Sequence, residues 1–266
     1  MIRASLIALV ALDLAMGGVS DAEAATPFKV LQLNLCNSGL AGCYEDGKAI
    51  GEGIAKIDSE RPDVVSVNEV CDDDVARMGN ETGYTAYFFP ARKRTGSETP
   101  PPPYFCKNGH QYGIGFLARP DHGDLVNSPQ YRWYTNQDTG SSEMRVMACG
   151  EYSEFVFCTT HLATVGSIAM KQCQELMSEA VAHAAHKPTV VAGDLNMRYQ
   201  AGTAPKAGPG GSPNVQACVP SGFFRKGDGS VQHIIAQQAA FGFSSTRTLS
   251  MSYTDHPAFV VNLLKN

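Results

Sequence analysis

One apolar stretch that stops abruptly in a glycine, an acid and an amide constrains the fold of this chain more than any other. Residues Val190–Ala192 fit a buried β-strand, because three apolar residues follow the break at Pro188. Gly193 lets the backbone turn, so Asp194 and Asn196 emerge together at the end of the strand. A plain turn uses the same residue types. The stretch therefore predicts either an ordinary turn or a sheet edge that presents two polar groups to one phosphate, water or metal.

The length and composition indicate one substantial hydrophobic core. The chain has 266 residues, of which 43% are hydrophobic, and it shows neither an internal repeat nor a second composition regime. We therefore expect a single domain over residues 26–266. The formal net charge is −5, which excludes a tight, non-specific nucleic-acid binder but leaves room for a hydrolase with a local basic patch.

Residues 1–25 have the pattern of a secretory signal peptide. Arg3 supplies the positive start, residues 4–16 are mostly apolar, and Ala22-Glu23-Ala24 is a small-residue cleavage site. Asp13 interrupts the apolar run, which leaves a lipid-anchored or uncleaved form open. No other apolar run approaches the length of a membrane span. We expect a secreted protein, extracellular or periplasmic, with no stable membrane insertion after cleavage.

The chain has eight cysteines, and an even number in an oxidising compartment predicts disulfides. No two cysteines have the C-x-x-C spacing of a metal cluster. One pair flanks a predicted hairpin turn and another can close a short loop, and elimination gives the remaining two. The expected pairs are Cys149–Cys158, Cys36–Cys43, Cys71–Cys106 and Cys173–Cys218.

Apolar periodicity predicts a chain in which strands alternate first with helices and then with loops. The predicted strands cover residues 28–35, 62–67, 84–89, 112–119, 130–134, 143–149, 154–160, 190–192, 232–236 and 258–263, with a further one near 124–127. The predicted helices cover residues 48–59, 72–78 and 167–183. A stretch over 201–214 is rich in Gly, Pro and Ala and predicts a loop.

Polar groups recur where these strands end. Taken alone, Glu69 would be a carboxylate at a helix start and His161 a structural hydrogen-bonding residue. Strand ends on one side of a β-sandwich converge, however, so we expect the whole set to meet in one site. The set consists of Asn34, Glu69, His161, Asp194, Asn196, Asp255 and His256.

Five short motifs resemble, in order and spacing, those of the endonuclease/exonuclease/phosphatase superfamily, the deoxyribonuclease-I-like fold. They are Leu33-Asn34-Leu35, Asn68-Glu69-Val70, Thr160-His161-Leu162, Gly193-Asp194-Leu195-Asn196 and Thr254-Asp255-His256-Pro257. The resemblance extends from about Phe28 to the end of the chain. It implies an α+β chain folded as a four-layer α/β/β/α sandwich that hydrolyses phosphoesters with Mg²⁺ or Mn²⁺.

The resemblance also implies which residues hold the metal. Glu69 would bind the cation, and Asn34 and Asp255 would support it directly or through water. Oxygen ligands of this kind suit hard Mg²⁺.

The catalytic roles that the resemblance implies fall on five further residues. Asp194 and Asn196 would orient the attacking water and the phosphate. His161 and His256 would donate hydrogen bonds to phosphate and exchange protons, because imidazole titrates near neutral pH. Arg145 matches the family's phosphate-contacting arginine, although a surface strand residue would look the same, and Asp255 and Tyr112 are further candidates at the site.

One position departs from the family pattern. Many relatives have an acid directly before the strand that here contains His233, and that acid orients a catalytic histidine. This chain has Gln232. A glutamine carbonyl accepts an imidazole N–H but stabilises imidazolium less than a carboxylate does.

We therefore predict a secreted, metal-dependent endonuclease or phosphodiesterase that acts on DNA, and we expect a monomer. A sphingomyelinase or an inositol-phosphate phosphatase is the alternative. A sphingomyelinase would carry an exposed aromatic hairpin, for which Tyr131–Tyr134 is the one faint candidate, and packing explains that stretch better. The Gln232 change leaves a catalytically inactive secreted binding protein as a second alternative.

Overall fold

The structure is a computed structural model that describes residues 25–96, 98–201 and 213–266. Almost all of the predicted signal peptide and most of the predicted loop over 201–214 lie outside these residues.

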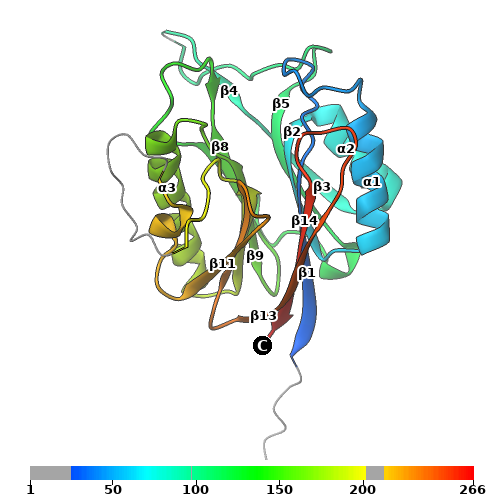
Figure 1. Ribbon diagram of the computed structural model, residues 1–266, viewed down its shortest axis with the longest axis vertical. Helices are drawn as coiled ribbons and strands as arrows, with labels where there is room; N and C mark the ends of the chain where they lie inside the picture. The colour runs from blue at the N-terminus through cyan, green and yellow to red at the C-terminus, as the bar shows by residue number, and fades with distance from the viewer. Residues whose placement is uncertain (1–24, 97, 202–212) are drawn as a thin grey trace, which may run out of the picture.

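Two six-stranded β-sheets stack face to face, and helices cover both outer faces (Figure 1). The first sheet has the order β13 (Phe241–Leu249), β14 (Ala258–Lys265), β1 (Thr26–Asn34), β2 (Val64–Cys71), β5 (Tyr112–Ala118), β3 (Thr85–Pro90). The second has the order β11 (Phe223–Gly227), β12 (Gln232–Gln237), β10 (Thr189–Asp194), β9 (Val156–His161), β8 (Val146–Glu151), β6 (Gln130–Trp133).

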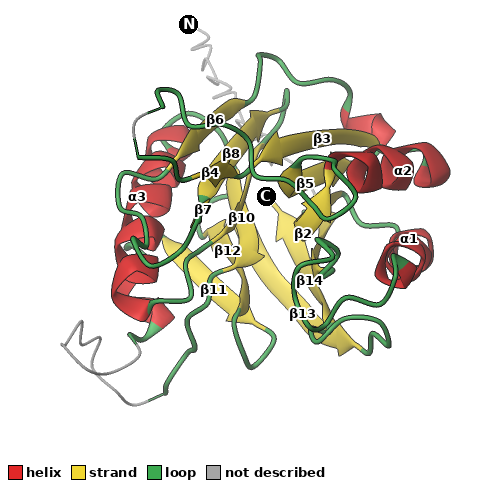
Figure 2. Cartoon of the chain, turned by 90° about the horizontal axis from the view of Figure 1, so that it is seen from above, coloured by secondary structure: helices red, strands yellow, loops and turns green. Residues whose placement is uncertain are grey.

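The helices complete the four layers. Helices α1 (Lys48–Glu60) and α2 (Asp72–Thr82) pack on the first sheet, and α3 (Gly166–Ala184) packs on the second (Figure 2). A short pair, β4 (Arg92–Lys93) with β7 (Glu143–Met144), and the 3-10 turns η1 (Pro120–His122) and η2 (Val215–Cys218) complete the described elements. The predicted α/β/β/α sandwich is confirmed.

Each sheet has a parallel pair of strands at its centre. Strand β1 runs parallel to β2, with Asn34 opposite Asn68, and β9 runs parallel to β10, with His161 opposite Asp194. The carboxyl ends of parallel strands meet at one edge of a sheet. This topology gathers the predicted strand-end side chains at one end of the sandwich.

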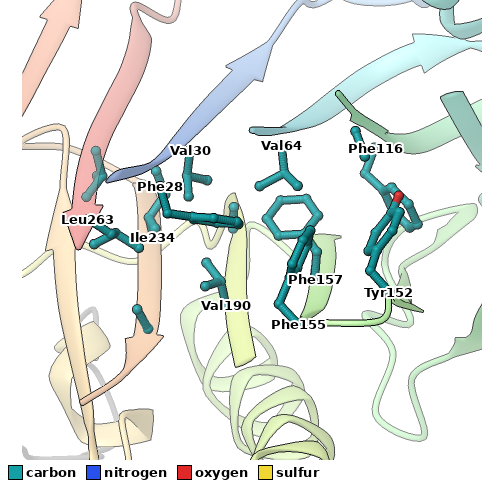
Figure 3. Close-up of a cluster of buried hydrophobic side chains, with 14 of the residues drawn as sticks. Phe28, Val30, Val64, Phe116, Tyr152, Phe155, Phe157, Val190, Ile234 and Leu263 are labelled. Carbon is teal, nitrogen blue, oxygen red and sulfur yellow. The ribbon is translucent and has the colours of Figure 1, made fainter. Parts of the chain in front are cut away.

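The side chains between the sheets change from apolar to polar toward that end. In β1, Phe28 and Val30 belong to the core between the sheets (Figure 3), whereas Gln32 and Asn34, farther along the same face, are buried and polar. The other central strands repeat the change: Val64 precedes Ser66 and Asn68 in β2, Phe157 precedes Thr159 and His161 in β9, and Val190 and Ala192 precede Asp194 in β10. The core between the sheets therefore ends in a polar layer.

Three details of the strand prediction were wrong. The strand predicted over 143–149 is interrupted at Arg145 and forms β7 and β8. Residues 124–127 form bends and no strand. Strands β11 and β13 were not predicted, because most of β13 is exposed and polar and therefore lacks an apolar alternation, while its hydrogen bonds to β14 hold it in the sheet.

All four predicted disulfides are confirmed. The structure joins Cys36–Cys43, Cys71–Cys106, Cys149–Cys158 and Cys173–Cys218, so no cysteine is free. Within the described ranges, no helix is both long and apolar enough to cross a membrane.

Candidate active site

A bulge in β2 aims Glu69 into the site. The pairing of β2 with β5 shifts register between Asn68 and Val70, and Glu69 has a φ of 56° there. Such left-handed backbone is uncommon outside glycine, and a bulge breaks the alternation of side chains. Asn68 points between the sheets, where its Nδ2 donates to the Thr160 carbonyl at 3.0 Å. The bulge allows the next residue, Glu69, to point toward the same end of the sandwich.

Asn34 links two carboxylates from opposite sheets. Its Nδ2 donates to Glu69 Oε1 at 2.9 Å and to Asp194 Oδ2 at 3.1 Å. Burial raises the pKa of both carboxyl groups, and the hydrogen bond from Asn34 opposes that rise. A buried acid and a partly buried one that share one amide donor form a centre of acidic groups.

Asn196 is held in a tight turn after β10. It has a φ of 49°, and its backbone N–H donates to Asp194 Oδ1 at 2.9 Å. Its Nδ2 donates to the Leu162 carbonyl at 2.8 Å and lies 3.1 Å from His161 Nε2. The turn therefore fixes the amide between the acid of one strand end and the imidazole of its neighbour.

The two histidines differ in depth. His161 is buried, its Nε2 lies 3.9 Å from Glu69 Oε1, and its Nδ1 has no hydrogen-bond partner among the described residues. Burial, reinforced by the charges of Arg145 and His256, holds the pKa of His161 well below its usual range. His256 is nearer the surface, with a side chain 19% exposed and Nε2 at 3.6 Å from Asp194 Oδ2. His161 is therefore a neutral imidazole, and His256 is the one that solvent can reach.

Asp255 lies at the rim. Its side chain is 60% exposed, and its Oδ1 is 3.7 Å from His256 Nε2. No direct contact joins Asp255 to Glu69 or Asn34 in the described part of the chain. Its predicted support of the metal stays a prediction, with a bridging water as the route that this placement allows.

Arg145 lies beside Glu69 in the interruption between β7 and β8. Its Nη1 is 3.2 Å from Glu143 Oε1, and both side chains line a cavity of about 240 Å³ together with Glu69 and Tyr112. Burial lowers the pKa of Arg145, but the negative charge of Glu143 and other acids outweighs burial and raises it overall. The guanidinium is therefore a permanent cation beside the two carboxylates.

The sequence profile of the Endonuclease/Exonuclease/phosphatase family matches residues 31–256. The chain belongs to this family. Its members are hydrolases that act on phosphoester bonds and typically depend on divalent metals. A comparison with curated protein sequences found no match.

Solved structures of the family have the same fold at low sequence identity. An endonuclease/exonuclease/phosphatase from Beutenbergia cavernae is 18% identical, with a TM-score of 0.66 over 90% of this chain and 72% of that one. The human Nocturnin catalytic domain with bound sulfate is 17% identical, with a TM-score of 0.64 over 90% and 94%. D. rerio TDP2 complexed with a single strand DNA product is 13% identical, with a TM-score of 0.62 over 90% and 99%.

The donor set of this family member fits a hard divalent cation. Within the described residues, the only hydrogen-bond donor to the Glu69 carboxylate is the Asn34 amide, and Arg145 forms its ion pair with Glu143 instead. Mg²⁺ is usually bound through one or two carboxylates, with water and substrate oxygens completing its shell. Glu69 would hold such an ion, and Asp194 faces it from the opposite sheet.

Gln232 acts differently from the acid that many family members have at this position. Its Nε2 donates to the Pro257 carbonyl at 2.7 Å and to Asp228 Oδ2 at 3.2 Å, and its Oε1 accepts from Gln32 Nε2 at 3.4 Å. Neither His161 nor His256 is among its partners. Because Pro257 follows His256, the amide positions that histidine through the backbone.

The sequence prediction did not assign roles to two groups of buried polar residues. One is the layer beneath the site, where Asn68 Oδ1 accepts from the backbone N–H of Asp194 at 2.9 Å and from Gln32 Nε2 at 2.7 Å. Polar residues two positions apart at the end of apolar strands would have revealed this layer. The other is Glu143, whose spacing from Arg145 carries no signal of its own.

Proposed function

We propose that this protein is a secreted, divalent-metal-dependent phosphoester hydrolase, an endonuclease or phosphodiesterase that cleaves DNA through attack of water on phosphorus. The observation that carries the proposal is a pair of carboxylates, the partly buried Glu69 and the buried Asp194, held by one amide between two imidazoles and a guanidinium.

A cation bound at Glu69 would neutralise phosphate charge and polarise the phosphorus–oxygen bond. Beside it, Asp194 orients the attacking water and takes up its proton, because a carboxylate with a raised pKa is a better base. Asn196, fixed by its turn, holds its amide against the His161 imidazole and so keeps that ring in position for the phosphate. Arg145 offsets the charge of the pentavalent transition state.

The two histidines have different roles, one in hydrogen bonding and one in proton exchange. His161 is neutral and deep, so it serves as a hydrogen-bonding group for a phosphate oxygen. His256 lies where the substrate enters and next to Asp194, so it exchanges protons with the departing oxygen and with solvent. This division follows from their burial.

Nucleic acid is favoured by exposed aromatic rings that lie against cations. Tyr199 is half exposed and lies 4.3 Å beneath the Arg225 guanidinium, and Phe243 is similarly exposed with Lys226 at 3.5 Å. Aromatic rings that stack on bases and cations that bind phosphates are typical of nucleic-acid surfaces. The four disulfides fit an oxidising compartment.

The aromatic hairpin of a sphingomyelinase has little support. Tyr134 is buried and bonds to Thr160 Oγ1 at 2.7 Å, and Tyr131 donates to the Pro90 carbonyl. Trp133 is 37% exposed, and Arg92 covers its ring. These side chains pack on the protein rather than extend toward a membrane.

The test is release of acid-soluble nucleotides from duplex DNA by the purified protein in Mg²⁺, with EDTA as a control. His256→Ala should abolish release, and His186→Ala, which removes an exposed histidine of no proposed role, should preserve it. Absence of release from folded, metal-binding protein would reject the DNA assignment, and failure on every phosphoester would support the inactive binder.

A further inference from the structure

The Cys36–Cys43 disulfide lies beside the candidate active site. Its two sulfur atoms and a carboxylate oxygen of Asp255 all lie within 4.8 Å of one another. The disulfide closes the first part of the connection from β1, which ends at Asn34, to α1. The cross-link is therefore close both to the strand end that carries Asn34 and to the loop that carries His256.

The backbone turn at Cys36 orients the Asn34 amide. Cys36 has a φ of 48°, and its N–H donates to Asn34 Oδ1 at 3.2 Å. With its oxygen held in this way, the amide presents Nδ2 to Glu69 and to Asp194. A flipped amide would turn its oxygen toward two other acceptors, with which it cannot hydrogen-bond. The Cys36 N–H therefore selects the orientation in which Asn34 bridges the two acids.

The disulfide fastens the outer half of the loop that follows this turn. Within the described part of the chain, residues 40–46 form hydrogen bonds only with residues 38–48. The inner half is fixed differently, since the Asn37 N–H donates to the Glu69 carbonyl at 2.7 Å. Left-handed backbone costs free energy at any residue other than glycine. The turn at Cys36 therefore needs a constraint, and the cross-link supplies one.

The loop before β14 depends on the same strand end. Thr254 Oγ1 donates to the Asn34 carbonyl at 2.9 Å, and the His256 N–H donates to Thr254 Oγ1 at 3.4 Å. A change in the backbone at Asn34 would therefore reach His256 as well as the bridging amide.

Cys36–Cys43 is also the disulfide most open to a reductant. Cys43 is half-buried, whereas the other seven cysteines are buried. Thiol–disulfide exchange requires that a thiolate reach one of the two sulfurs. In contrast, Cys149 and Cys158 lie opposite each other in paired strands and belong to the core under α3. Reduction under native conditions should therefore begin at Cys36–Cys43 and leave that core closed.

We propose that the Cys36–Cys43 disulfide is a positioning group of the active site, which holds the Cys36 N–H on the Asn34 amide, and that its reduction inactivates the site in a folded protein. The inference rests on the proposed phosphoester hydrolysis. In the reducing step a dithiol breaks the S–S bond, becomes a cyclic disulfide and passes two protons to the thiols of Cys36 and Cys43. The chain would thus complete its active site only in an oxidising compartment.

The test compares the wild type with two double variants, Cys36→Ala/Cys43→Ala and Cys36→Gly/Cys43→Ala. Hydrolysis of bis(p-nitrophenyl) phosphate in Mg²⁺ gives kcat and KM, and calorimetric titration gives the affinity for Mn²⁺. The alanine pair should lose about 10–100-fold in kcat and in Mn²⁺ affinity, the usual effect of removing a group that orients a metal-site residue, with a smaller change in KM. The glycine pair should recover part of both losses, because glycine adopts left-handed backbone without a cross-link.

Cys149→Ala/Cys158→Ala is the matched control. It also removes one disulfide, but β8 and β9 stay paired through their hydrogen bonds, so it should lower stability and keep the kcat of the folded molecules. Circular dichroism and thermal unfolding check that each variant is folded. Wild-type kcat and Mn²⁺ affinity in the folded alanine pair would overturn the inference. An equal loss in the control, or a glycine pair no better than the alanine pair, would overturn it too.

Reduction of the wild type provides a second measurement. After treatment with dithiothreitol under native conditions, one portion is alkylated and its thiols are mapped by mass spectrometry, and another is assayed once the reductant has been removed. The kcat should fall in proportion to the thiols found at Cys36 and Cys43, with unchanged circular dichroism, and reoxidation should restore it. A fall in kcat that follows the thiols of another pair would contradict the inference.

The same measurements separate the inference from the proposed function. If the wild type hydrolyses no phosphoester, the proposed function fails and Mn²⁺ affinity decides the inference, which a loss in the alanine pair but not in the control would support. Equal turnover and equal Mn²⁺ affinity in all variants would reject the inference and keep the proposed hydrolase.

Discussion

At the end of the sandwich opposite the candidate active site, a second charged group surrounds a larger cavity, of about 570 Å³. There Asp63 accepts hydrogen bonds from the backbone N–H of Lys29 at 2.6 Å and from Arg119 Nη2 at 2.7 Å, and His122 Nε2 lies 2.9 Å from it. Glu154 pairs with Lys265. In this cluster each of these carboxylates has a cationic partner.

The site end lacks such matching. Glu69 and Asp194 are bridged by the neutral amide of Asn34, and the nearest basic atom to Asp194 is His256 Nε2 at 3.6 Å. Of these two cavities, the larger one lies at the end without the candidate active site. The two ends differ in whether their carboxylates have cationic partners within the protein. Carboxylates without such partners are typical of sites where a metal or a substrate supplies the opposite charge.

Among these substitutions, Asp194→Asn at the site end should have the largest effect, and that effect should be on the rate of hydrolysis. Loss of the carboxylate should lower the rate of phosphoester hydrolysis by about 10³-fold. Burial raises the pKa of Asp194, so folding works against its ionised form, and the neutral amide should leave the free energy of unfolding unchanged or raised. Steady-state kinetics and urea unfolding at pH 7 measure the two effects. A large loss of stability with little loss of rate would make Asp194 structural.

Acid should destabilise the site end through His233. Burial lowers the pKa of His233 to about 4, although its hydrogen bond to the Met197 carbonyl opposes that shift. As the pH falls below about 6.5, His233 binds a proton in the unfolded chain but stays neutral in the folded protein. The free energy of unfolding therefore decreases between about pH 6.5 and 4, by up to about 3 kcal/mol. His233→Gln should flatten this dependence relative to the wild type. Urea unfolding at pH 7 and 4.5 checks it, and an unchanged slope would contradict the buried neutral imidazole.

A smaller effect, on stability alone, is expected from Asp63→Asn. The amide cannot accept from three donors as the carboxylate does, and Arg119 keeps only Asp121 of its two charge partners. We expect a loss of about 2 kcal/mol in the free energy of unfolding and an unchanged turnover rate per folded molecule. If turnover fell in proportion to that of Asp194→Asn, the functional contrast between the ends would be wrong.

The sequence predicted the strand-end residues from local signals and the disulfides from cysteine spacing and elimination, whereas the four layers followed from the family resemblance. Apolar alternation locates the central strands, and a polar residue that ends such a strand stands out against it. Asn34, His161 and Asp194 belong to this class. The family motifs added the residues expected to join them, and the parallel pairing of β1 with β2 and of β9 with β10 explains why residues far apart in sequence meet.

The rest depends on contacts between segments without local signals. Glu143 becomes important because β7 brings it against Arg145 and the cavity, and its sequence neighbours do not indicate this. The family pattern has an acid that orients a histidine at the position of Gln232, whereas the amide of Gln232 donates to Pro257 and Asp228, which come from separate segments. The bulge at Glu69 depends on pairing with β5. These features follow from tertiary packing, which periodicity does not encode.

The pairing of β1 with β14 has a consequence for the order of folding. Thr26 lies opposite Lys265, and β1 lies between β2 and β14 in the first sheet. During synthesis from the amino end, almost the whole described chain is made before β14, the second neighbour of β1, is complete. Until then β1 has an open, aggregation-prone edge. His256 lies just before β14. The chain therefore adds the last of its proposed catalytic groups and closes its first sheet in the same late stage, so partly made chains lack both His256 and a protected edge.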